Sequence, residues 1–145
     1  MITCKFENGK EALLRHVVTD AVCIKDGKIL LEKRSPHMLQ GGKYALPGGY
    51  LDRDETLEQG VLRELREETG YAGKIVKLLS VVDRPDRGDD RQNVCFLYLI
   101  EATEKVSEGD DETSEVAWFD LNALPAPEMF AFDHYQLIQH YLEQQ

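Results

Sequence analysis

The sequence of residues 48–71 is GGYLDRDETLEQGVLRELREETGY, and this stretch decides the expected fold and chemistry. It places Glu64, Glu67 and Glu68 at helical offsets of zero, three and four. On an α-helix such positions are neighbours on one face, with Cβ atoms roughly 5–6 Å apart. Carboxylates this close repel one another, so the pattern predicts a cation beside them.

A hard divalent ion is the natural candidate for this cation. Mg²⁺ takes oxygen ligands in near-octahedral geometry and is usually held by a few carboxylates together with substrate phosphates, and Mn²⁺ could replace it. The alternative is an ordinary solvated face, because charge-rich helices usually are just that. A short acidic motif alone does not decide between the two interpretations.

The residues around the glutamates predict where the helix begins and ends. Thr56 is expected to cap its N-terminus, with Gln59 as the reciprocal partner. Gly70 is placed to end it in a left-handed conformation. Gly60 lies in mid-helix, where it costs about 1 kcal/mol relative to Ala, and the pattern offers no reason for it. The apolar side of the helix consists of Leu57, Val61, Leu62 and Leu65.

The same stretch resembles the Nudix box. The match comprises Gly49, then Glu55 after five residues, and after seven more the run RELREETGY at 63–71. Tyr71 departs from the pattern, since the family more often has an aliphatic residue there, which concerns packing and not chemistry. The resemblance implies an α/β/α sandwich with a mixed β-sheet, in which the box forms a loop–helix–loop catalytic motif. It also implies hydrolysis of a diphosphate linkage in a nucleoside diphosphate derivative.

Charge requirements and the resemblance assign roles to individual residues. The expected metal ligands are Glu64, Glu67, Glu68 and, by resemblance, the backbone carbonyl of Gly48. Arg63 is expected to pair with Glu55 and hold the loop against the helix through charge-assisted hydrogen bonds. A general base could be a box glutamate or a loop carboxylate. Glu112 is preferred because its separation from Trp118 along the sequence resembles that in some relatives. A solvated loop charge is the alternative for Glu112.

Three features are similar to ADP-ribose pyrophosphatase-type members of the family: PGG before the box, the Arg- and Asp-rich loop at 83–91, and LPAPEMFAFDH at 124–134. They favour ADP-ribose, cleaved to AMP and ribose 5-phosphate. Two alternatives stay open within enzymes, a nucleoside triphosphate (including an oxidised one) or a dinucleoside polyphosphate, because the box does not recognise the base. A non-catalytic nucleotide sensor is a third alternative, which the complete set of box glutamates disfavours.

Several residues outside the box are candidates for substrate binding, because a guanidinium can bind phosphate oxygens bidentately. The candidates are Arg34, which follows the second expected strand, and Arg84, Arg87 and Arg91 in the loop at 83–91. Each could instead be a surface charge. The aromatic residues Phe96, Tyr98, Trp118 and Phe130 could stack on a base, but aromatics that alternate in strands are usually core. His134 is expected on the surface or at a helix cap.

Hydrophobic patterning places further elements around the box. Strands are expected at 16–24, 28–32, 75–82, 93–102 and 116–119, and a terminal amphipathic helix at 132–142. The Asp26–Gly27 step favours a hairpin between the first two strands. Strands on both sides of a central helix, followed by a second helix, predict a mixed sheet covered on its faces, an α/β arrangement.

Composition limits the remaining possibilities. With 145 residues, 42% of them hydrophobic, residues 1–145 are expected to form one domain with a sizeable core. The net charge of −10 disfavours nucleic acid and anionic membrane as partners, although metal ions would let a small phosphate ester bind. The absence of an apolar span or secretory signal, and three cysteines without metal-site or disulfide spacing, favour a cytoplasmic protein. A homodimer is expected by analogy alone.

Overall fold

The computed structural model describes residues 1–87 and 92–145. Helix α1 comprises Leu57–Thr69 and helix α2 comprises His134–Leu142. The strands are β1 (Ile2–Lys5), β2 (Glu11–Leu14), β3 (Val17–Lys25), β4 (Lys28–Arg34), β5 (Tyr44–Ala45), β6 (Gly48–Tyr50), β7 (Tyr71–Val82), β8 (Val94–Lys105) and β9 (Thr113–Asp120). Among the described residues, no helix is both long and apolar enough to cross a membrane.

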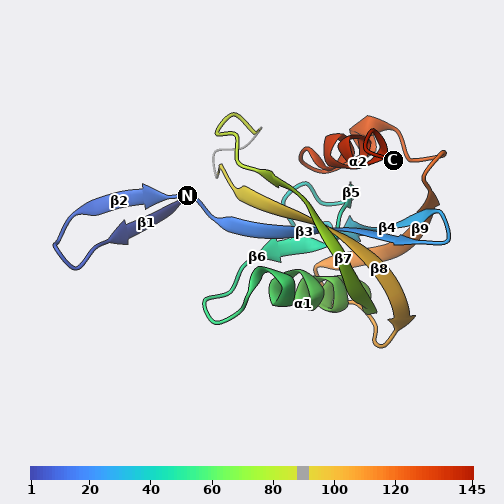
Figure 1. The fold of residues 1–145 in the computed structure, drawn as a ribbon, viewed down its shortest axis with the longest axis horizontal. Coiled ribbons are helices and arrows are strands. Elements are labelled where there is room, and N and C mark those ends of the chain that lie inside the picture. The colour runs from blue at the N-terminus through green and yellow to red at the C-terminus, as the bar shows by residue number, and fades with distance from the viewer. Residues whose placement is uncertain (88–91) are drawn as a thin grey trace.

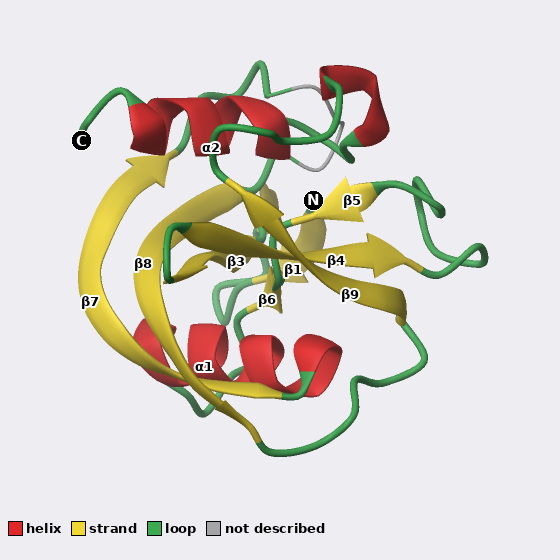
Figure 2. Cartoon of the chain, turned by 90° about the vertical axis from the view of Figure 1, so that its right-hand side faces the viewer, coloured by secondary structure: helices red, strands yellow, loops and turns green. Residues whose placement is uncertain are grey.

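One mixed sheet forms the centre of the molecule, in the order β5–β4–β3–β8–β7, with β6 beside β3 and β9 beside β4 (Figure 1). Strands β3 and β8 run parallel, and the other pairings of this sheet are antiparallel. Helix α1 covers one face and α2 the other, as Figure 2 shows. The predicted mixed sheet with covered faces is therefore confirmed.

Strand β3 connects the sheet to the box. It meets β4 across the expected turn at Asp26 and Gly27, whose φ angles of 50° and 73° are both positive, as a tight two-residue hairpin requires. Nearer its N-terminus β3 pairs with β6, so that Asp20 lies opposite Gly48 and Thr19 opposite Gly49. Gly48 and Gly49, where the box begins, are thus fixed beside the middle strand of the sheet.

A separate hydrophobic core lies under each helix. On one face, Val61 and Leu65 of α1 pack with buried Ala21, Cys23, Leu30, Tyr98 and Ile100. On the other, Leu137, Ile138 and Tyr141 of α2 pack with buried Val22, Ile29, Leu31, Leu97 and Phe130. Burying each large side chain stabilises the fold by about 1.5–3 kcal/mol. Phe96 and Trp118 are partly buried against the first core, so the aromatic strand residues belong to the interior as expected.

The predicted element boundaries are wrong at several polar ends. Strand β7 begins at Tyr71 and β8 continues to Lys105, because these two residues pair with each other and extend the antiparallel ladder beyond its apolar part. Strand β9 begins at Thr113, which pairs with Arg34. Helix α2 begins only at His134, since Phe132 has a left-handed φ of 53°. Backbone pairing and local turns set these boundaries, and the pattern of hydrophobic residues in the sequence reveals neither of them.

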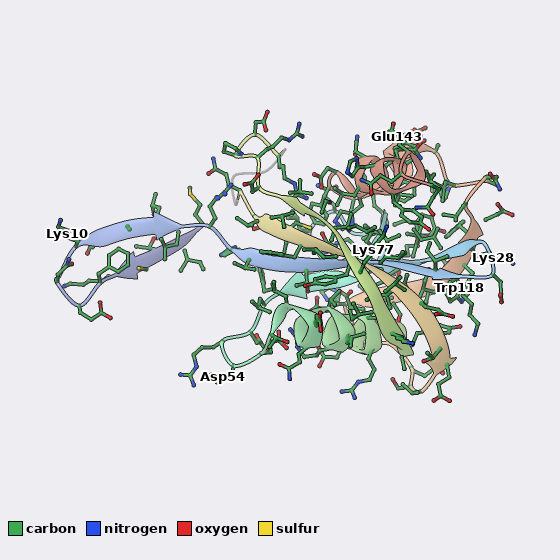
Figure 3. All side chains as sticks on the ribbon, viewed as in Figure 1. Lys10, Lys28, Asp54, Lys77, Trp118 and Glu143 are labelled. Atoms are coloured by element: carbon green, nitrogen blue, oxygen red, sulfur yellow. The ribbon has the colours of Figure 1, made fainter. Side chains whose placement is uncertain are left out.

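An N-terminal hairpin was not predicted from the sequence. Strands β1 and β2 pair from Ile2↔Leu14 to Lys5↔Glu11 and form a two-stranded sheet of their own. The hairpin projects away from the body, with Lys10 near its tip (Figure 3). Its signal was the Asn8–Gly9 step, a strong hairpin turn, at which Gly9 has φ of 81°.

Candidate active site

Helix α1 begins and ends as predicted. The Thr56 hydroxyl accepts a hydrogen bond from the Gln59 backbone N–H (3.2 Å), and the Gln59 side chain accepts one from the Thr56 N–H (2.8 Å). At the other end Gly70 has φ of 75° and donates its N–H to the carbonyl of Arg66. These caps fix the residues at which the helix begins and ends, and with them the helix face on which the box side chains lie.

Arg63 connects the loop before the helix to the box carboxylates. Its Nε and Nη2 donate to Glu55 at 2.9 and 2.6 Å, and Nη1 donates to Glu64 at 2.8 Å and to Glu67 at 3.1 Å. Nη2 also donates to the carbonyl of Tyr50 at 3.1 Å. The hydrogen bonds to Glu55 are the largest cause of the raised pKa of Arg63, and they lower the pKa of Glu55. The expected ion pair is present, and its role in catalysis stays a prediction.

The packing of this ion pair explains the glycine in the middle of α1. A Cβ atom on Gly60 would lie 3.0 Å from Glu55 Oε1 and 3.0 Å from Leu51 Cδ1. Glu55 Oε1 also accepts the Asp52 N–H at 2.8 Å, so this carboxylate is held from two sides. The loop therefore approaches the helix so closely that a Cβ at position 60 would push the Glu55 and Leu51 side chains back by a few tenths of an ångström.

Two box carboxylates lie directly against the backbone of Gly48 and Gly49. Glu68, only 4% exposed, accepts the Gly48 N–H at 2.7 Å. A Cβ atom on Gly49 would lie 2.7 Å from Glu64 Oε1, and one on Gly48 would collide with Asp20 Oδ1. A Cβ atom at position 48 would thus overlap the backbone of β3, and one at position 49 would displace the Glu64 carboxylate.

A buried glutamate on β4 belongs to the same cluster and was missed in the sequence. Glu32 is 1% exposed, accepts a hydrogen bond from the Thr113 hydroxyl and lies 3.5 Å from Arg34 Nη1. Burial is the largest cause that raises the pKa of Glu32, to about 7. Burial also raises the pKa of Glu68, and the charge of Glu32 raises it further. The one signal of this buried acid in the sequence was its place directly after the apolar residues 29–31, within KILLEK at 28–33.

The loop before β9 brings two more acids to the cluster. The Asp110 N–H donates to the carbonyl of Glu67 at 2.8 Å, and the Asp110 side chain accepts the Glu112 N–H at 3.0 Å. The Glu112 carbonyl accepts the Ser35 N–H at 2.8 Å, which ties the loop to the end of β4. Burial raises the pKa of Glu64, and the charge of Glu112 contributes to this rise. Glu112 therefore lies near the box, and its role as general base stays a prediction.

The carboxylate set fits a hard divalent ion in its chemistry. Among residues 1–87 and 92–145, no three acidic, His or Cys side chains already stand as a metal-binding group. Glu64 and Glu67 are turned onto Arg63, and Glu68 is turned onto the Gly48 N–H. The carboxylates of half-buried Glu64 and buried Glu68 both have raised pKa values, and a divalent cation bound between them would offset their mutual repulsion. The ligand assignment stays a prediction.

A cavity of about 520 Å³ borders the glycines of the box and receives some of the predicted substrate-binding residues. Arg34 lines it, with its Nε donating to the Leu39 carbonyl at 2.8 Å. Arg87 also lines it, and its guanidinium is bound to the Asp133 carboxylate at 2.7 and 2.8 Å. Arg84 does not line this cavity, and its side chain is 72% exposed to solvent. Arg91 lies outside the described residues.

The structure places His134 in the wall of this cavity, so the expectation of a surface or capping residue is wrong. It is 8% exposed, and its Nδ1 accepts the Leu46 N–H at 2.9 Å. The segment before it is held against β5, because the Ala131 N–H donates to the Tyr44 carbonyl at 2.8 Å. This tertiary contact pulls the first turn of α2 inward and has no local sequence signal.

Comparisons with known proteins agree with this architecture. The ADP-ribose pyrophosphatase of Methanocaldococcus jannaschii is 37% identical over 126 residues, which cover 87% of this chain and 72% of that protein. The crystallised NUDIX domain of Shewanella oneidensis NrtR, complexed with ADP ribose, is 30% identical with a TM-score of 0.74, covering 92% of this chain and 90% of that chain.

A third similar structure is a bifunctional NMN adenylyltransferase/ADP ribose pyrophosphatase from Francisella tularensis, complexed with AMP and a Mn ion. It is 28% identical with a TM-score of 0.75, and the match covers 90% of this chain and 42% of that chain. The family profile of the NUDIX domain matches residues 14–141, which include every box residue. The resemblance based on residues 49–71 is thereby confirmed over nearly the whole sequence, and the chain belongs to the NUDIX family.

Proposed function

We propose that this chain is a Mg²⁺-dependent pyrophosphohydrolase that cleaves ADP-ribose to AMP and ribose 5-phosphate. The observation that carries this proposal is the close approach of Glu68 to Gly48 and of Glu64 to Gly49, two glycines that line the cavity, with Glu67 held beside Glu64 by Arg63 Nη1. Membership of a hydrolase family supports the reaction class. The M. jannaschii relative and the ADP-ribose complex of the NrtR domain support the substrate.

NUDIX hydrolases use divalent metal ions, and the oxygen donors of this chain support Mg²⁺ in particular. The residues that would hold the ion are Glu64, Glu67, Glu68 and the carbonyl of Gly48. When bound there, the ion would shield the diphosphate oxygens, orient a water molecule and stabilise the leaving phosphate. Glu68 is desolvated, so it attracts a cation more strongly than an exposed carboxylate does.

Arg63 and Glu55 act as positioning residues in this proposal. Arg63 Nη1 holds the carboxylates of Glu64 and Glu67, while its other nitrogens grip Glu55 in the preceding loop. Removing the guanidinium would free the loop and both carboxylates without deleting a ligand. Such variants should lose turnover chiefly through a weaker apparent affinity for Mg²⁺.

Glu112 is the proposed acceptor of the proton from the attacking water. Its backbone is fixed on both sides, by Ser35 and by Asp110, while its side chain is exposed to solvent. A solvent-exposed side chain on a fixed backbone can reach a water molecule beside the box, as a general base must. Unchanged turnover of Glu112→Gln would remove it from this role.

Arg34 is the proposed phosphate-binding residue. It lines the cavity, its side chain is 13% exposed, and its Nη1 lies 3.5 Å from Glu32 Oε1 at the edge of the carboxylate cluster. A guanidinium between the cavity and the cluster can neutralise one phosphate of a diphosphate whose other oxygens face the glutamates. Arg84 and Arg91 are proposed as further phosphate contacts from their place in the sequence loop at 83–91.

A substrate panel tests the proposal. ADP-ribose, other nucleotide sugars, dinucleoside polyphosphates, NADH and normal or oxidised nucleoside triphosphates are compared by kcat/KM, each with and without Mg²⁺. Preferred conversion of ADP-ribose to AMP and ribose 5-phosphate is the expected result. Preference for a triphosphate would move the enzyme to another substrate class, and absence of Mg²⁺-dependent turnover on every member would favour a nucleotide sensor.

A single domain, a cytoplasmic location and a homodimer that binds neither nucleic acid nor membrane are part of the same proposal. The free thiols of Cys4, Cys23 and Cys95 support the location, because disulfides are rare in the cytosol. The projecting hairpin exposes apolar Ile2, Phe6 and Leu13, which supports association. Fractionation of cells and light scattering of the purified protein test these two points.

A further inference from the structure

One buried hydroxyl beside the box has no hydrogen-bond partner. Thr19, in the middle strand β3, is 0% exposed, and its Oγ1 has no partner within residues 1–87 and 92–145. An unpaired buried hydroxyl destabilises a fold, because it has lost its hydrogen bonds to water and gained none in return. Valine is branched in the same way and would fill the position without this cost. Packing alone therefore does not explain the Thr19 hydroxyl.

The alternation of side chains along β3 shows which face of the sheet Thr19 occupies. Thr19 lies on the same face as Ala21 and Cys23, which belong to the core under α1. Helix α1 covers that face (Figure 2). Asp20 lies on the opposite face, where it lines the cavity. The Thr19 hydroxyl is therefore outside the cavity, between the sheet and the helix that bears the box glutamates.

Two cross-strand neighbours flank Thr19 on this face. On one side is Phe96 of the parallel strand β8, whose ring packs against the core under α1 and has no oxygen or nitrogen to accept the hydroxyl. On the other side is Gly49 of the antiparallel strand β6. The Cβ positions of such opposed residues are roughly 4.5–5.5 Å apart. A Cβ on Gly49 would lie 2.7 Å from Glu64 Oε1 and 3.1 Å from Oε2, so the Glu64 carboxylate is the polar group beside Thr19.

One oxygen of Glu64 also lacks a hydrogen-bond donor. Oε1 accepts Arg63 Nη1 at 2.8 Å, whereas Oε2 has no donor in the part of the chain that the structure describes. Arg63 and a divalent ion are both cations, so they repel each other across a shared carboxylate, and ion binding favours a turn of Glu64 away from Arg63. A carboxylate that binds a metal is in turn held by a hydrogen bond from a neighbouring group, which orients it.

We propose that Thr19 is a positioning residue of the metal site: when Glu64 turns from Arg63 to the divalent ion, the Thr19 hydroxyl donates to the Glu64 carboxylate. The hydroxyl replaces the hydrogen bond that Glu64 loses, and it holds the ligand in one orientation. Thr19 contacts neither substrate nor ion and acts through Glu64. The inference rests on the proposed function, in which Glu64 is a metal ligand, and adds to it a residue that sets the affinity for the metal.

Binding of Mn²⁺ alone to the purified protein tests this role without substrate or turnover. Mn²⁺ takes the same oxygen ligands as Mg²⁺, and electron paramagnetic resonance measures the concentration of the free ion. Thr19→Val keeps the branched shape and removes the hydroxyl, and it should weaken the Kd for Mn²⁺ about tenfold, as the loss of a hydrogen bond that orients a ligand does. Thr19→Ser keeps the hydroxyl and should bind Mn²⁺ within about twofold of the wild type.

Thermal stability is a second readout, and its change has the opposite sign. In the metal-free protein Thr19→Val should raise Tm by roughly 2–4 °C, because it removes an unpaired buried hydroxyl. Saturating Mn²⁺ should remove this gain, since the wild type then forms the hydrogen bond. Ser80→Ala is the matched control, because Ser80 Oγ is also buried without a partner among the described residues but lies on β7, two strands away from β3. It should change Tm equally with and without Mn²⁺ and leave the Kd unchanged.

A double substitution shows whether Thr19 acts through Glu64. Glu64→Ala removes the acceptor, so Thr19→Val should not weaken Mn²⁺ binding further in that background. A further tenfold loss there, an unchanged Kd in Thr19→Val alone, or an equal loss in Thr19→Ser would overturn the inference. A metal-free Thr19→Val protein that is less stable than the wild type, or does not fold, would do the same, because the hydroxyl would then already stabilise the metal-free protein.

The inference and the proposed function fail separately. If Glu64→Ala weakens Mn²⁺ binding and Thr19→Val does not, Glu64 remains a metal ligand and the inference alone fails. If Thr19→Val weakens Mn²⁺ binding as expected but the wild type does not hydrolyse ADP-ribose, the positioning role is upheld and the proposed substrate is wrong. If Glu64→Ala binds Mn²⁺ as the wild type does, the ligand assignment and the inference are both wrong.

Discussion

Replacing Glu32 with Gln is expected to stabilise the metal-free protein in alkaline solution and to have little effect in acid. Burial raises the pKa of Glu32 from 4.5 to about 7. The folded protein therefore binds this proton more tightly than the unfolded chain does. Stability declines as the pH rises from about 4.5, and above about 7 the whole cost of the buried charge is present.

The magnitude follows from the pKa difference. At about 1.4 kcal/mol per tenfold change in proton affinity, a rise from 4.5 to about 7 corresponds to about 3 kcal/mol. For a chain of this size that free energy corresponds to roughly 10 °C in Tm. Gln keeps an oxygen that can accept the Thr113 hydroxyl hydrogen bond, so the substitution removes the charge and preserves the contact.

Urea unfolding with a chelator present, at about pH 5 and about pH 8.5, measures the effect. Glu115→Gln is the matched control on β9, because its side chain is 49% exposed and has little burial cost. The control should show no pH-dependent gain. An equal effect of Glu32→Gln at both pH values, or destabilisation at the higher one, would show that the buried charge of Glu32 does not destabilise the folded protein.

Three further outcomes are expected. Gly60→Ala should lower Tm, although Ala favours helix by about 1 kcal/mol, because its Cβ would lie 3.0 Å from Glu55 Oε1; a higher Tm would show that the loop yields. Gly49→Ala should keep the fold by circular dichroism but lose most Mg²⁺-dependent turnover, since its Cβ would meet Glu64 at 2.7 Å; wild-type kcat would contradict this. Burial lowers the pKa of His134, so the folded protein binds fewer protons there and stability should fall as the pH drops through about 6.5. Urea unfolding of His134→Gln should show a weaker fall, and an identical pH profile would exclude this residue as its source.

The box could be predicted because its determinants lie within one continuous segment. The caps at Thr56 and Gly70 act over a few residues, and the pairing of Arg63 with Glu55 follows from local charge requirements. Spacing along a single helix also brings the three glutamates to one face. Local sequence contains all of this information.

The rest of the site could not be predicted because distant segments build it. Glu32 reaches the cluster through the register of β4 and β9, and Asp20 through the pairing of β3 with β6. Phe132 and His134 enter the cavity because their segment is held against β5 and the backbone takes a left-handed turn. Tertiary pairing decides these positions, and no periodicity in one sequence encodes them.

We propose above all that the box carboxylates hold the divalent ion on which hydrolysis depends. The most direct test is kcat/KM for ADP-ribose over a Mg²⁺ titration, comparing Glu68→Gln with Glu58→Gln, an exposed glutamate in the first turn of the same helix. We expect kcat/KM to fall on the order of 10²–10⁴-fold in Glu68→Gln and to stay unchanged in the control, since the ion would supply several kcal/mol of transition-state stabilisation. Full Mg²⁺-dependent activity of Glu68→Gln would show that this carboxylate does not hold the ion.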